Sequence, residues 1–571
     1  MHSSTFTIPS LLTILLLYVQ VQGSDTSSQT ILTSNNQTTF PPPSSPSPRK
    51  VAIIGSGLSG ATAAYYLHDS TCEIQPIHIT VFERSPQPGG RIKSVKYRGK
   101  TLEVGAPAVS THDWCFLRAM RDVGLEPKKP DRAWKFRVKR TLGVWDGERL
   151  FDARAHEPLC MNWWELIVSV WREGRHAWLF RKVSHPMWWE VGRLVWRYGV
   201  EAARFQRAVV GDLDAWDGFG RDFYDWETHT FGDLGVEADK SGLDVRALGS
   251  AREYLRGLDV SERFLEEVVE PYARGRFARN LDSLRGIAAE MAYREFYARS
   301  VAVAEGNVRL VDRLITLSKA DLKLNTSVKE IEPGKFKRFN LGIESSLPDS
   351  TVETRWEEFD AVIIATPLHL SGISFAESLN IHFETTASKT PLCERHITHL
   401  VSSHCLSPEF FNLPPGTRLP DTILTTANSS TNPEIFSVTL LDTLTRIDTT
   451  YCSPWDLEDC DMVVYEMIFR IVSSEAIDNQ TLAEMVGSPT DYEFPFVHRQ
   501  VWPYITPDES GSQLPTGKIE IVPGLFYTGR GEDIVASLEM SCRMGFNAGI
   551  KASNDLYDAW RKEARGTQIR G

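Results

Sequence analysis

Short runs of consecutive apolar residues interrupt the mixed hydrophobic and polar pattern of this chain. VAII (51–54) and ITVF (79–82) lie near its N-terminal end, and AVII (361–364) lies much later. Uninterrupted apolar runs of this length predict strands covered on both faces, as in a parallel sheet. ATAAYYLHD (61–69) has apolar residues at helical spacing. The first three of these elements predict a strand, a helix and a strand, which is typical of an α/β class.

A glycine-rich turn, GSGLSG (55–60), joins the first strand to the helix. In this G-x-G-x-x-G spacing, Gly55 permits a tight turn, Gly57 lets the backbone approach a pyrophosphate, and Gly60 permits close packing of helix against strand. The anion would lie at the helix N-terminus, where amide groups are unpaired. We therefore predict that the whole turn binds a dinucleotide: Gly55, Ser56, Gly57, Leu58, Ser59 and Gly60.

Glu83 ends the second strand, where a carboxylate can bind the hydroxyls of a ribose. The interval from Gly55 is longer than the usual ~20 residues, because TCEIQPIH (71–78) extends the connection. The alternative is a solvated surface glutamate. The position of Glu83 at the end of an apolar strand favours ribose binding.

Length and composition are those of an ordinary globular protein with more than one domain. The chain has 571 residues, of which 42% are hydrophobic and 24% charged. The formal net charge of −12 argues against a nucleic-acid partner, because such proteins normally carry a basic excess. No CxxC or His/Cys cluster indicates a metal site.

The N-terminal segment has the composition of a targeting signal. Residues 8–21 form an apolar run followed by the small residue Gly23, which predicts a signal peptide at 1–23. The run has no preceding Lys or Arg, so an uncleaved signal anchor is the alternative. Residues 24–49 are rich in Ser, Thr, Asn, Gln and Pro, which predicts a disordered linker.

Sequons and cysteines support entry into the secretory pathway, with a vacuole, a lysosome or the extracellular space as the destination. The chain has 8 cysteines, and Cys452 and Cys460 bracket a short loop, so we predict that they form a disulfide. Disulfides and buried thiols remain equal alternatives for the other six. Glycosylation is predicted at the N-x-[ST] sequons of Asn36, Asn325, Asn428 and Asn479.

The residues after the second strand carry a resemblance to a family. The order Glu83, Arg84, then GGR (89–91), then Gly105-Ala106 is similar to glycine-glycine-arginine flavoproteins, which include amine oxidases, phytoene desaturases and prenylcysteine oxidases. The resemblance implies FAD, with the GGR turn beside the pyrophosphate and the Gly105-Ala106 loop beside the isoalloxazine. It also implies an adenine contact by the backbone of Val328 and a last flavin-binding turn at Gly529. The cofactor residues implied are Glu83, Arg84, Gly90, Arg91, Gly105, Ala106, Val328 and Gly529.

The chain has no second G-x-G-x-x-G unit, so we expect no separate NAD(P)H domain. Electrons would then come from the substrate and leave to oxygen, which indicates an oxidase. The expected fold is an FAD-binding Rossmann-like domain with an interleaved α+β substrate domain. We predict FAD-binding segments at 50–112, 301–370 and 519–565, a helical substrate insert at 113–300 and a second substrate insert at 371–518.

Two stretches of the chain narrow the resemblance to prenylcysteine oxidases, also called prenylcysteine lyases. These are FLEEVVEPYARGRFARNLDSLRGIAAEMAY (264–293) and VAEGNVRLVDRLITLSKADLKLNTSVKEI (303–331). The resemblance implies oxidative cleavage of a prenylcysteine thioether to a prenyl aldehyde, cysteine and hydrogen peroxide, with oxygen as acceptor. It departs at Arg276–Arg279, where family members carry Asn-Tyr-Gly-Gln. An amine oxidase, or a flavin-binding, lipid-interacting protein without turnover, is the alternative.

Candidate substrate residues follow from this resemblance and from residue chemistry. Trp502 and Tyr504 are candidates for an aromatic wall beside the flavin, against ordinary packing. Arg274, Arg276 and Arg279 are candidates for binding the cysteine carboxylate, against a solvated face. The Trp- and Arg-rich segment 161–199 is either a lipid-facing patch that contacts a membrane peripherally or a set of core helices. No stable protein partner is predicted.

Overall fold

The computed structural model describes residues 48–571 with gaps. The signal peptide, most of the linker, Asn36, Cys452, Cys460 and most of the Trp-rich segment lie outside the described residues. No helix in the described part combines the length and apolar content needed to cross a bilayer. The gaps are 72–75, 108, 111–112, 128–140, 153–191, 193, 212–248, 298–299, 348–350, 380, 382–392, 430, 432, 448–462, 505–517, 534 and 571.

A six-stranded sheet carries the glycine-rich turn, and its order is β20-β21-β13-β1-β2-β9. Its centre is parallel, as the apolar runs predict, and only β20 pairs antiparallel, with β21. Val51 and Ile53 pack against helices on one face, and Ala52 and Ile54 pack against a second sheet on the other. This explains why the runs do not alternate. The strands are β1 (Arg49–Ile54), β2 (Ile77–Phe82), β9 (Asp321–Lys323), β13 (Ala361–Ile364), β20 (Glu520–Val522) and β21 (Leu525–Tyr527).

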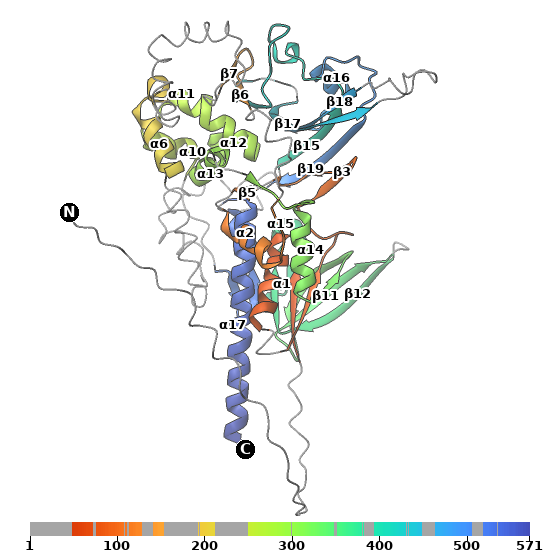
Figure 1. The fold of residues 1–571 in the computed structure, drawn as a ribbon. Coiled ribbons are helices and arrows are strands. Elements are labelled where there is room, and N and C mark those ends of the chain that lie inside the picture. Colours follow the sequence, from red (N-terminus) through yellow and green to blue (C-terminus); the bar gives the residue numbers. More distant parts are fainter. Residues whose placement is uncertain are drawn as a thin grey trace, which may run out of the picture. The chain divides into compact units, whose positions relative to one another are not determined.

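Helices from both ends of the chain cover one face of this sheet. α1 (Leu58–Thr71) packs against the long α17 (Leu538–Arg570), and α14 (Val308–Leu317) also contacts α1 (Figure 1). Gly545 and Gly549 permit the close approach of α17. A Cβ at Gly545 would lie 2.1 Å from Ser59 O, and one at Gly549 would lie 2.7 Å from Ala63 O.

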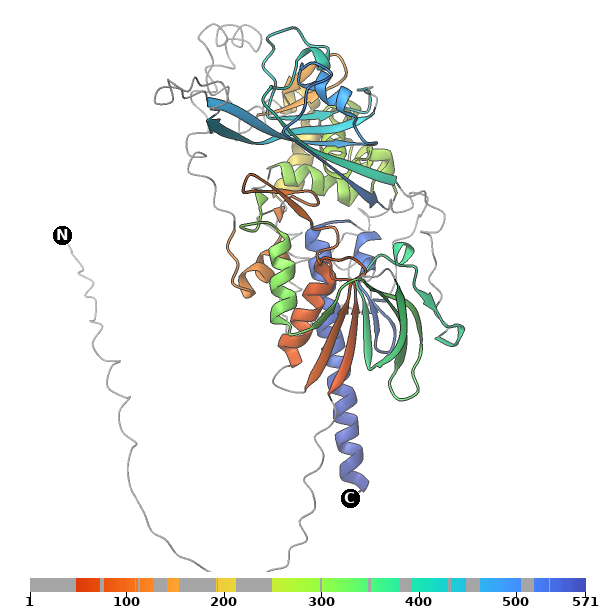
Figure 2. The same cartoon turned by 90° about the vertical axis from the view of Figure 1, so that its right-hand side faces the viewer.

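The other face of the parallel sheet packs against a four-stranded sheet of order β12-β11-β10-β14 (Figure 2). Phe82 and Ile364 meet Val328 and Leu341 in this core. The parallel sheet is therefore buried on both faces, as in a Rossmann-like unit. The strands are β10 (Thr326–Pro333), β11 (Phe339–Ser346), β12 (Val352–Phe359) and β14 (Ser374–Phe375).

A seven-stranded sheet, of order β19-β15-β18-β17-β16-β6-β7, combines strands from both predicted inserts. A helical cluster also forms in the first insert, and α12 packs on β16 and β17. The strands are β6 (Leu142–Trp145), β7 (Leu150–Asp152), β15 (Cys393–Ser402), β16 (Thr422–Thr425), β17 (Ile435–Ile447), β18 (Val463–Ser473) and β19 (Phe496–Tyr504). The helices are α6 (Val200–Gly211), α10 (Ala251–Gly257), α11 (Glu262–Phe264), α12 (Glu270–Phe277), α13 (Gly286–Tyr297) and α16 (Asn479–Met485).

Short elements complete the described fold. The strand pairs are β3 (Ser94–Tyr97) with β4 (Lys100–Glu103), and β5 (Val109–Ser110) with β8 (Ser300–Val301). The helices are α2 (Trp114–Asp122) and α15 (Leu368–Ser371), with π-helical residues at Leu265–Val269 and 3-10 turns at Leu281–Ser283, Glu377–Leu379, Glu409–Phe411 and Gly529–Asp533.

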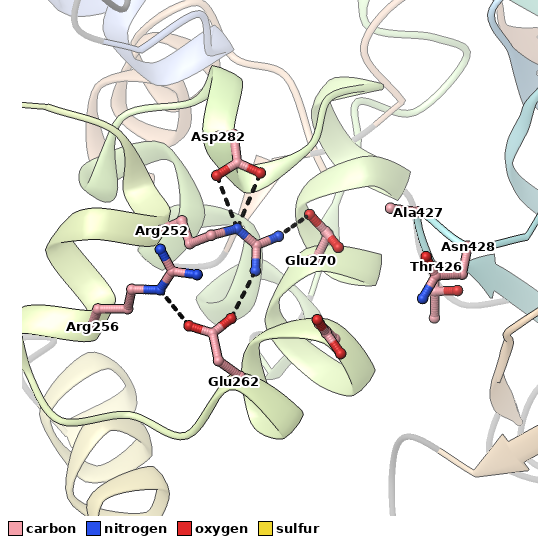
Figure 3. A pocket seen from close by; sticks show the side chains of 9 residues that line it. Arg252, Arg256, Glu262, Glu270, Asp282, Thr426, Ala427 and Asn428 are labelled. Atoms are coloured by element: carbon pink, nitrogen blue, oxygen red, sulfur yellow. Dashed lines mark hydrogen bonds and ion pairs between the residues drawn. The ribbon is translucent and has the colours of Figure 1, made fainter.

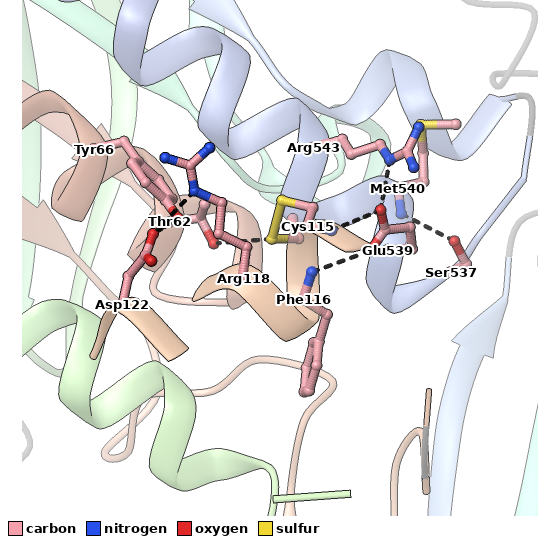
Figure 4. The surroundings of a disulfide bond; sticks show 11 residues. Thr62, Tyr66, Cys115, Phe116, Arg118, Asp122, Ser537, Glu539, Met540 and Arg543 are labelled. Carbon is pink, nitrogen blue, oxygen red and sulfur yellow. Dashed lines mark hydrogen bonds and ion pairs between the residues drawn. A yellow bond between two sulfur atoms is a disulfide. The ribbon is translucent and has the colours of Figure 1, made fainter. Parts of the chain in front are cut away.

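A disulfide that the sequence did not single out joins α2 to α17. It links Cys115 and Cys542, which are separated by 427 residues and have Cα atoms 5.9 Å apart (Figure 4). Beside it, Glu539 of α17 accepts hydrogen bonds from the first amide groups of α2, Cys115 N at 2.9 Å and Phe116 N at 3.1 Å. A carboxylate at this position satisfies unpaired donors of a helix N-terminus.

Candidate functional site

The two glycine turns of the predicted cofactor site lie against each other. Gly89 N donates to Ser56 O at 3.1 Å, and Gly57 and Gly89 form an isolated parallel bridge. A Cβ at Gly90 would lie 3.3 Å from Gly57 Cα. The G-x-G-x-x-G turn and the GGR turn, separate in the sequence, therefore form one surface.

The glycines of the first turn have different roles in this packing. A Cβ at Gly60 would lie 2.0 Å from Gly55 O, so Gly60 is required by the fold. A Cβ at Gly57 would meet no atom within 4 Å, so this face of the turn is open. Open backbone at the start of α1 is what a pyrophosphate needs in order to approach the amide groups.

Two buried polar atoms at this surface have no hydrogen bond partner among the described residues: Ser59 Oγ and His369 Nε2. Burial lowers the pKa of His369, while Glu532 raises it and Arg91 lowers it, which places the ring beside the GGR turn. Buried polar atoms are normally paired, so these two are candidates to contact a bound group. The sequence did not indicate His369 as a site residue, except that it follows the predicted strand AVII (361–364).

Glu83 is buried at the end of β2, as predicted. Its carboxylate accepts hydrogen bonds from Ser56 N at 2.9 Å, Ser56 Oγ at 2.6 Å and Ser85 N at 2.9 Å. The alternative of a solvated surface glutamate is therefore wrong, since only 6% of the residue is exposed. Glu83 holds the turn directly, and its contact with a ribose stays a prediction.

The predicted cofactor arginines lie at the surface beside this turn. Arg91 forms an ion pair with Glu532, in the 3-10 turn that begins at Gly529. Arg84 donates from Nη1 to Leu370 O at 2.9 Å. Segments from both ends of the chain thus meet at the GGR turn. A contact of either arginine with a cofactor stays a prediction.

The Gly105-Ala106 loop is held by Asn307 and reached by Trp502. Asn307 is fully buried, and its Nδ2 donates to Ala106 O at 3.1 Å. The indole Nε1 of Trp502 donates to Val104 O at 2.7 Å. This contact brings Trp502 to the loop expected beside the isoalloxazine, although its role as an aromatic wall stays a prediction. Asn307 belonged to the resembling segment, but nothing in the sequence assigned it this contact.

Val328 and Gly529 occupy the positions expected of them in the fold. Val328 is buried in β10, where the register with β11 shifts between Val328 and Glu330. Gly529 follows β21, and Thr528 N donates to Ile364 O at 3.0 Å. Their contacts with FAD stay predictions. Tyr504 lies in β19, but its side chain is outside the described residues.

The arginines predicted to bind a carboxylate have other partners. Arg274 is fully buried, bonds Thr425 O at 3.0 Å and forms an ion pair with Glu434 at 2.6 Å. Arg276 forms an ion pair with Glu295 at 2.5 Å. These contacts argue against the predicted carboxylate role, because Arg274 instead joins α12 to the seven-stranded sheet. They also argue against the alternative of a solvated face.

Ala278 in the departing stretch ends α12 with a φ of 56°, and Arg279 follows it. The resemblance places glycine at this position, and glycine is the residue that the left-handed region favours. The departing stretch of this chain therefore contains a left-handed residue that is not glycine.

A polar pocket of about 330 Å³ lies between helices of the first insert and residues 426–428 of the second (Figure 3). At its centre, Arg252 forms ion pairs with Glu262 at 3.1 Å, Glu270 at 2.8 Å and Asp282 at 2.9 Å. It contains none of the predicted cofactor residues and no apolar lining suited to a prenyl chain. We assign it to the ion-pair network that holds α10, α11 and α12 together.

Asp113, beside the disulfide, gives the protein a pH dependence. It is 2% exposed, and its pKa is raised to about 7 by burial and by the charges of Glu539 and Glu295. The ordinary pKa of an aspartate is about 3.9. Between these values the folded state holds a proton that the unfolded state lacks, so stability falls as pH rises.

We expect Asp113→Asn to remove this dependence. Asn can still accept the bond from Ser110 N, which is 2.7 Å long, and it cannot ionise. The melting temperature of the natural protein should fall between pH 5 and pH 7.5 more than that of the variant. Asp491→Asn, at an exposed turn, is the control and should melt like the natural protein at both pH values. If the melting temperatures of the natural protein and of Asp113→Asn changed equally with pH, the pH dependence could not be assigned to Asp113.

Three described sequons, at Asn325, Asn428 and Asn479, lie at exposed positions. An exposed asparagine is required of a glycosylation acceptor, so the structure permits modification at each. Glycosylation at these positions stays a prediction.

Comparison with known proteins identifies the family. The family model for prenylcysteine lyase matches residues 182–563, and that for an NAD(P)-binding Rossmann-like domain matches residues 53–121. The chain belongs to the prenylcysteine lyase family. The family match covers residues 182–300 of the first insert, the whole second insert and nearly all of the C-terminal flavin segment.

Several relatives and one solved structure agree with this family and fold. The chain is 25% identical over 538 residues to prenylcysteine oxidase 1 of Bos taurus, covering 90% of this chain and 89% of that protein. It is 22% identical over 338 residues to farnesylcysteine lyase of Arabidopsis thaliana, covering 59% and 61%. A putative protoporphyrinogen oxidase from Exiguobacterium has the same fold, with a TM-score of 0.50, 13% identity and coverage of 89% and 99%.

The cofactor of this site is FAD, and the protein is an FAD-dependent oxidoreductase. The described residues fit this cofactor. Gly57 leaves open the face of the turn that a pyrophosphate would approach, and Ser59 Oγ has no hydrogen-bond partner among the described residues. The resemblance drawn from the GGR turn and the two longer stretches is confirmed by the family match.

Proposed function

We propose that the protein is a thioether oxidase that cleaves farnesyl- or geranylgeranyl-cysteine during degradation of prenylated proteins. The products would be a prenyl aldehyde, free cysteine and hydrogen peroxide, formed from prenylcysteine, water and oxygen. The observation that carries this proposal is the family match over residues 182–563, which includes much of the first insert and all of the second, the parts expected to bind substrate. The names of relatives in Bos taurus and Arabidopsis thaliana support it.

When bound, FAD supplies the two-electron chemistry, accepting a hydride from the substrate and passing electrons to oxygen. The residues of the chain would bind, orient and exclude water. Gly57 and Ser59 would hold the pyrophosphate at the start of α1, and Ser56 would support the turn through its bonds to Glu83. Asn307 fixes the Gly105-Ala106 loop, and Trp502 covers that loop from the seven-stranded sheet.

Targeting to the secretory pathway is part of this proposal. The signal peptide predicted at 1–23, the exposed sequons and the disulfide between Cys115 and Cys542 support it, since disulfides persist in oxidising compartments. A lysosomal or vacuolar destination would suit an enzyme of prenylated-protein degradation. Oxygen and a small prenylated substrate are the proposed partners.

The test of this function is reduction of the bound flavin by candidate substrates. We expect farnesylcysteine or geranylgeranylcysteine to bleach the purified holoprotein anaerobically, and to release one peroxide per aldehyde in air. Putrescine and cyclohexylamine are the comparison substrates for an amine oxidase, and they should leave the flavin oxidised. If only the amines bleached the flavin, the protein would be an amine oxidase. A yellow protein that no substrate bleaches would instead support a flavin-binding, lipid-interacting protein without turnover.

A further inference from the structure

A row of basic and polar side chains crosses one face of the seven-stranded sheet. Thr439, Arg470, His399 and His498 lie on four neighbouring strands, and each is directly opposite the next in the antiparallel registers. Directly opposite residues point to the same face, with Cβ atoms about 4.5–5.5 Å apart. The row is therefore a continuous feature, assembled from β17, β18, β15 and β19.

This face of the sheet is turned toward the FAD-binding segment. Two residues along from the row, Val401 and Ile468 pack with Tyr97 and Leu102 of the β3-β4 hairpin. In the other direction, Trp502 bonds Val104 O in the loop expected beside the isoalloxazine. The row lies between these two contacts, because residues two apart on a strand share a face.

Electrostatic effects agree with the proximity of the row to that segment. The ring of His399 approaches the backbone of Glu103, which raises the pKa of His399, and the charge of Lys93 lowers the pKa of His498. Both Glu103 and Lys93 come from the FAD-binding segment, next to Gly105. The row is thus within reach of a substrate bound at this loop.

Several buried polar atoms of the row lack a partner among the described residues. His399 is 0% exposed, and beyond its approach to the Glu103 backbone neither ring nitrogen has a hydrogen-bond partner there. The Nε2 of His498 and the Nε of Arg470 are also buried without a partner there. Unpaired buried donors and acceptors are costly, so several at one place indicate a site that a ligand completes.

The charge of the row is positive and is not balanced within the described part of the chain. Burial lowers the pKa of Arg470 to about 9, and Arg395 and Arg276 lower it further by repulsion. Burial also lowers the pKa of His399 to about 3, with further effects of Arg470 and His498, so that ring is neutral at pH 7. Among the described residues, no acidic side chain contributes to either shift.

Nearby acids are already paired with other cations. Glu466 bonds Arg98 at 3.4 Å, and Asp442 bonds Lys100 at 3.0 Å. Arg470 is half-buried and has no carboxylate partner among the described residues, which is unfavourable, and a planar guanidinium binds carboxylates in a bidentate way. The row is therefore suited to a small anion that carries a carboxylate.

We propose that Arg470 binds the α-carboxylate of the amino-acid thioether substrate, and that His399 and His498 complete this subsite as neutral hydrogen-bonding groups. This inference rests on the proposed function and adds a substrate requirement to it. A free carboxylate would be needed, so free prenylcysteine would be preferred over its methyl ester and over a prenylcysteine extended into a peptide at its carboxyl group. Arg470 replaces Arg274 and Arg276 as the residue for this role.

The test compares Arg470→Met with the natural holoprotein on farnesylcysteine and on its methyl ester. The natural protein should favour the free acid in kcat/KM by about 10- to 100-fold, the range of a charge-assisted hydrogen bond pair. Arg470→Met should lose this preference through KM for the acid and should keep the kcat/KM for the ester. Arg470→Lys should retain part of the preference. Arg499→Met is the control, because this exposed arginine points to the other face of β19 and bonds Ile477 O at 2.7 Å.

A binding measurement separates this inference from the proposed function. Dodecanoate and dodecanol are titrated into each holoprotein, and the shift of the flavin absorption gives their Kd values. In Arg470→Met, the Kd of dodecanoate should rise while that of dodecanol stays the same. If this difference were found in a protein that oxidises no prenylcysteine, the carboxylate subsite would be supported and the proposed function would be rejected. An equal loss for acid and ester, together with weaker sulfite addition to FAD, would assign Arg470 to the flavin and overturn the inference.

Discussion

Gly57→Ala is expected to weaken FAD binding by about 10- to 100-fold while leaving the fold unchanged, because an added methyl group in a filled site costs about 1–3 kcal/mol. In the protein alone, the new Cβ meets no atom within 4 Å, and Gly57 has no left-handed φ that alanine would resist. With cofactor present, the same methyl group would occupy the face that the pyrophosphate approaches. The measurement is FAD titration of the apoprotein, with melting of the apoprotein as the second readout.

Gly60→Ala is the matched comparison, one helical turn further along. Its Cβ would lie 2.0 Å from Gly55 O, so backbone must move, and the apoprotein itself should melt at a lower temperature. The two variants thus separate the role of a glycine in cofactor approach from its role in packing. A stable Gly57→Ala protein that binds FAD as well as the natural protein would reject the proposed position of the pyrophosphate.

Local patterns were enough to predict the strand, turn and helix that form the cofactor half of this site. The apolar strands, the glycine turn and Glu83 are close in the sequence, and each has a direct physical requirement that residue type reveals. Glu83 is buried and holds Ser56, as a strand-end carboxylate in a dinucleotide site should. The contact between the GGR turn and the first turn followed from a family resemblance rather than from spacing.

The substrate half depends on strand register, which the sequence does not display. Arg470 and His399 are 71 positions apart in the chain, and only the pairing of β18 with β15 places them opposite each other. Arg274 and Arg276 were predicted to bind a carboxylate from the chemistry of arginine alone, yet α12 directs them into ion pairs with Glu434 and Glu295. The disulfide between Cys115 and Cys542 was not singled out, because these cysteines are 427 residues apart and only the packing of α2 against α17 brings them together.

Loss of the disulfide between Cys115 and Cys542 is expected to destabilise the protein by about 2–5 kcal/mol, the usual cost of removing a native disulfide. Its position extends the effect to the cofactor site. Cys542 is on α17 one turn before Gly545, whose backbone packs on Ser59 at the start of α1. Cys115→Ser, Cys542→Ser and the double variant should therefore also release FAD at lower temperatures than the natural protein, as measured by flavin fluorescence during melting.

A double-mutant cycle distinguishes a bond from two independent packing losses. If the two sulfurs are bonded, either single substitution removes the whole bond, so the double variant should melt close to the single variants rather than at twice their loss. Cys405→Ser, an exposed free cysteine, is the control and should melt like the natural protein. Dithiothreitol should lower the melting temperature of the natural protein but leave that of the double variant unchanged. Additive losses from the two substitutions would show that packing alone is involved, and that α2 and α17 are held together by Glu539 and the surrounding core.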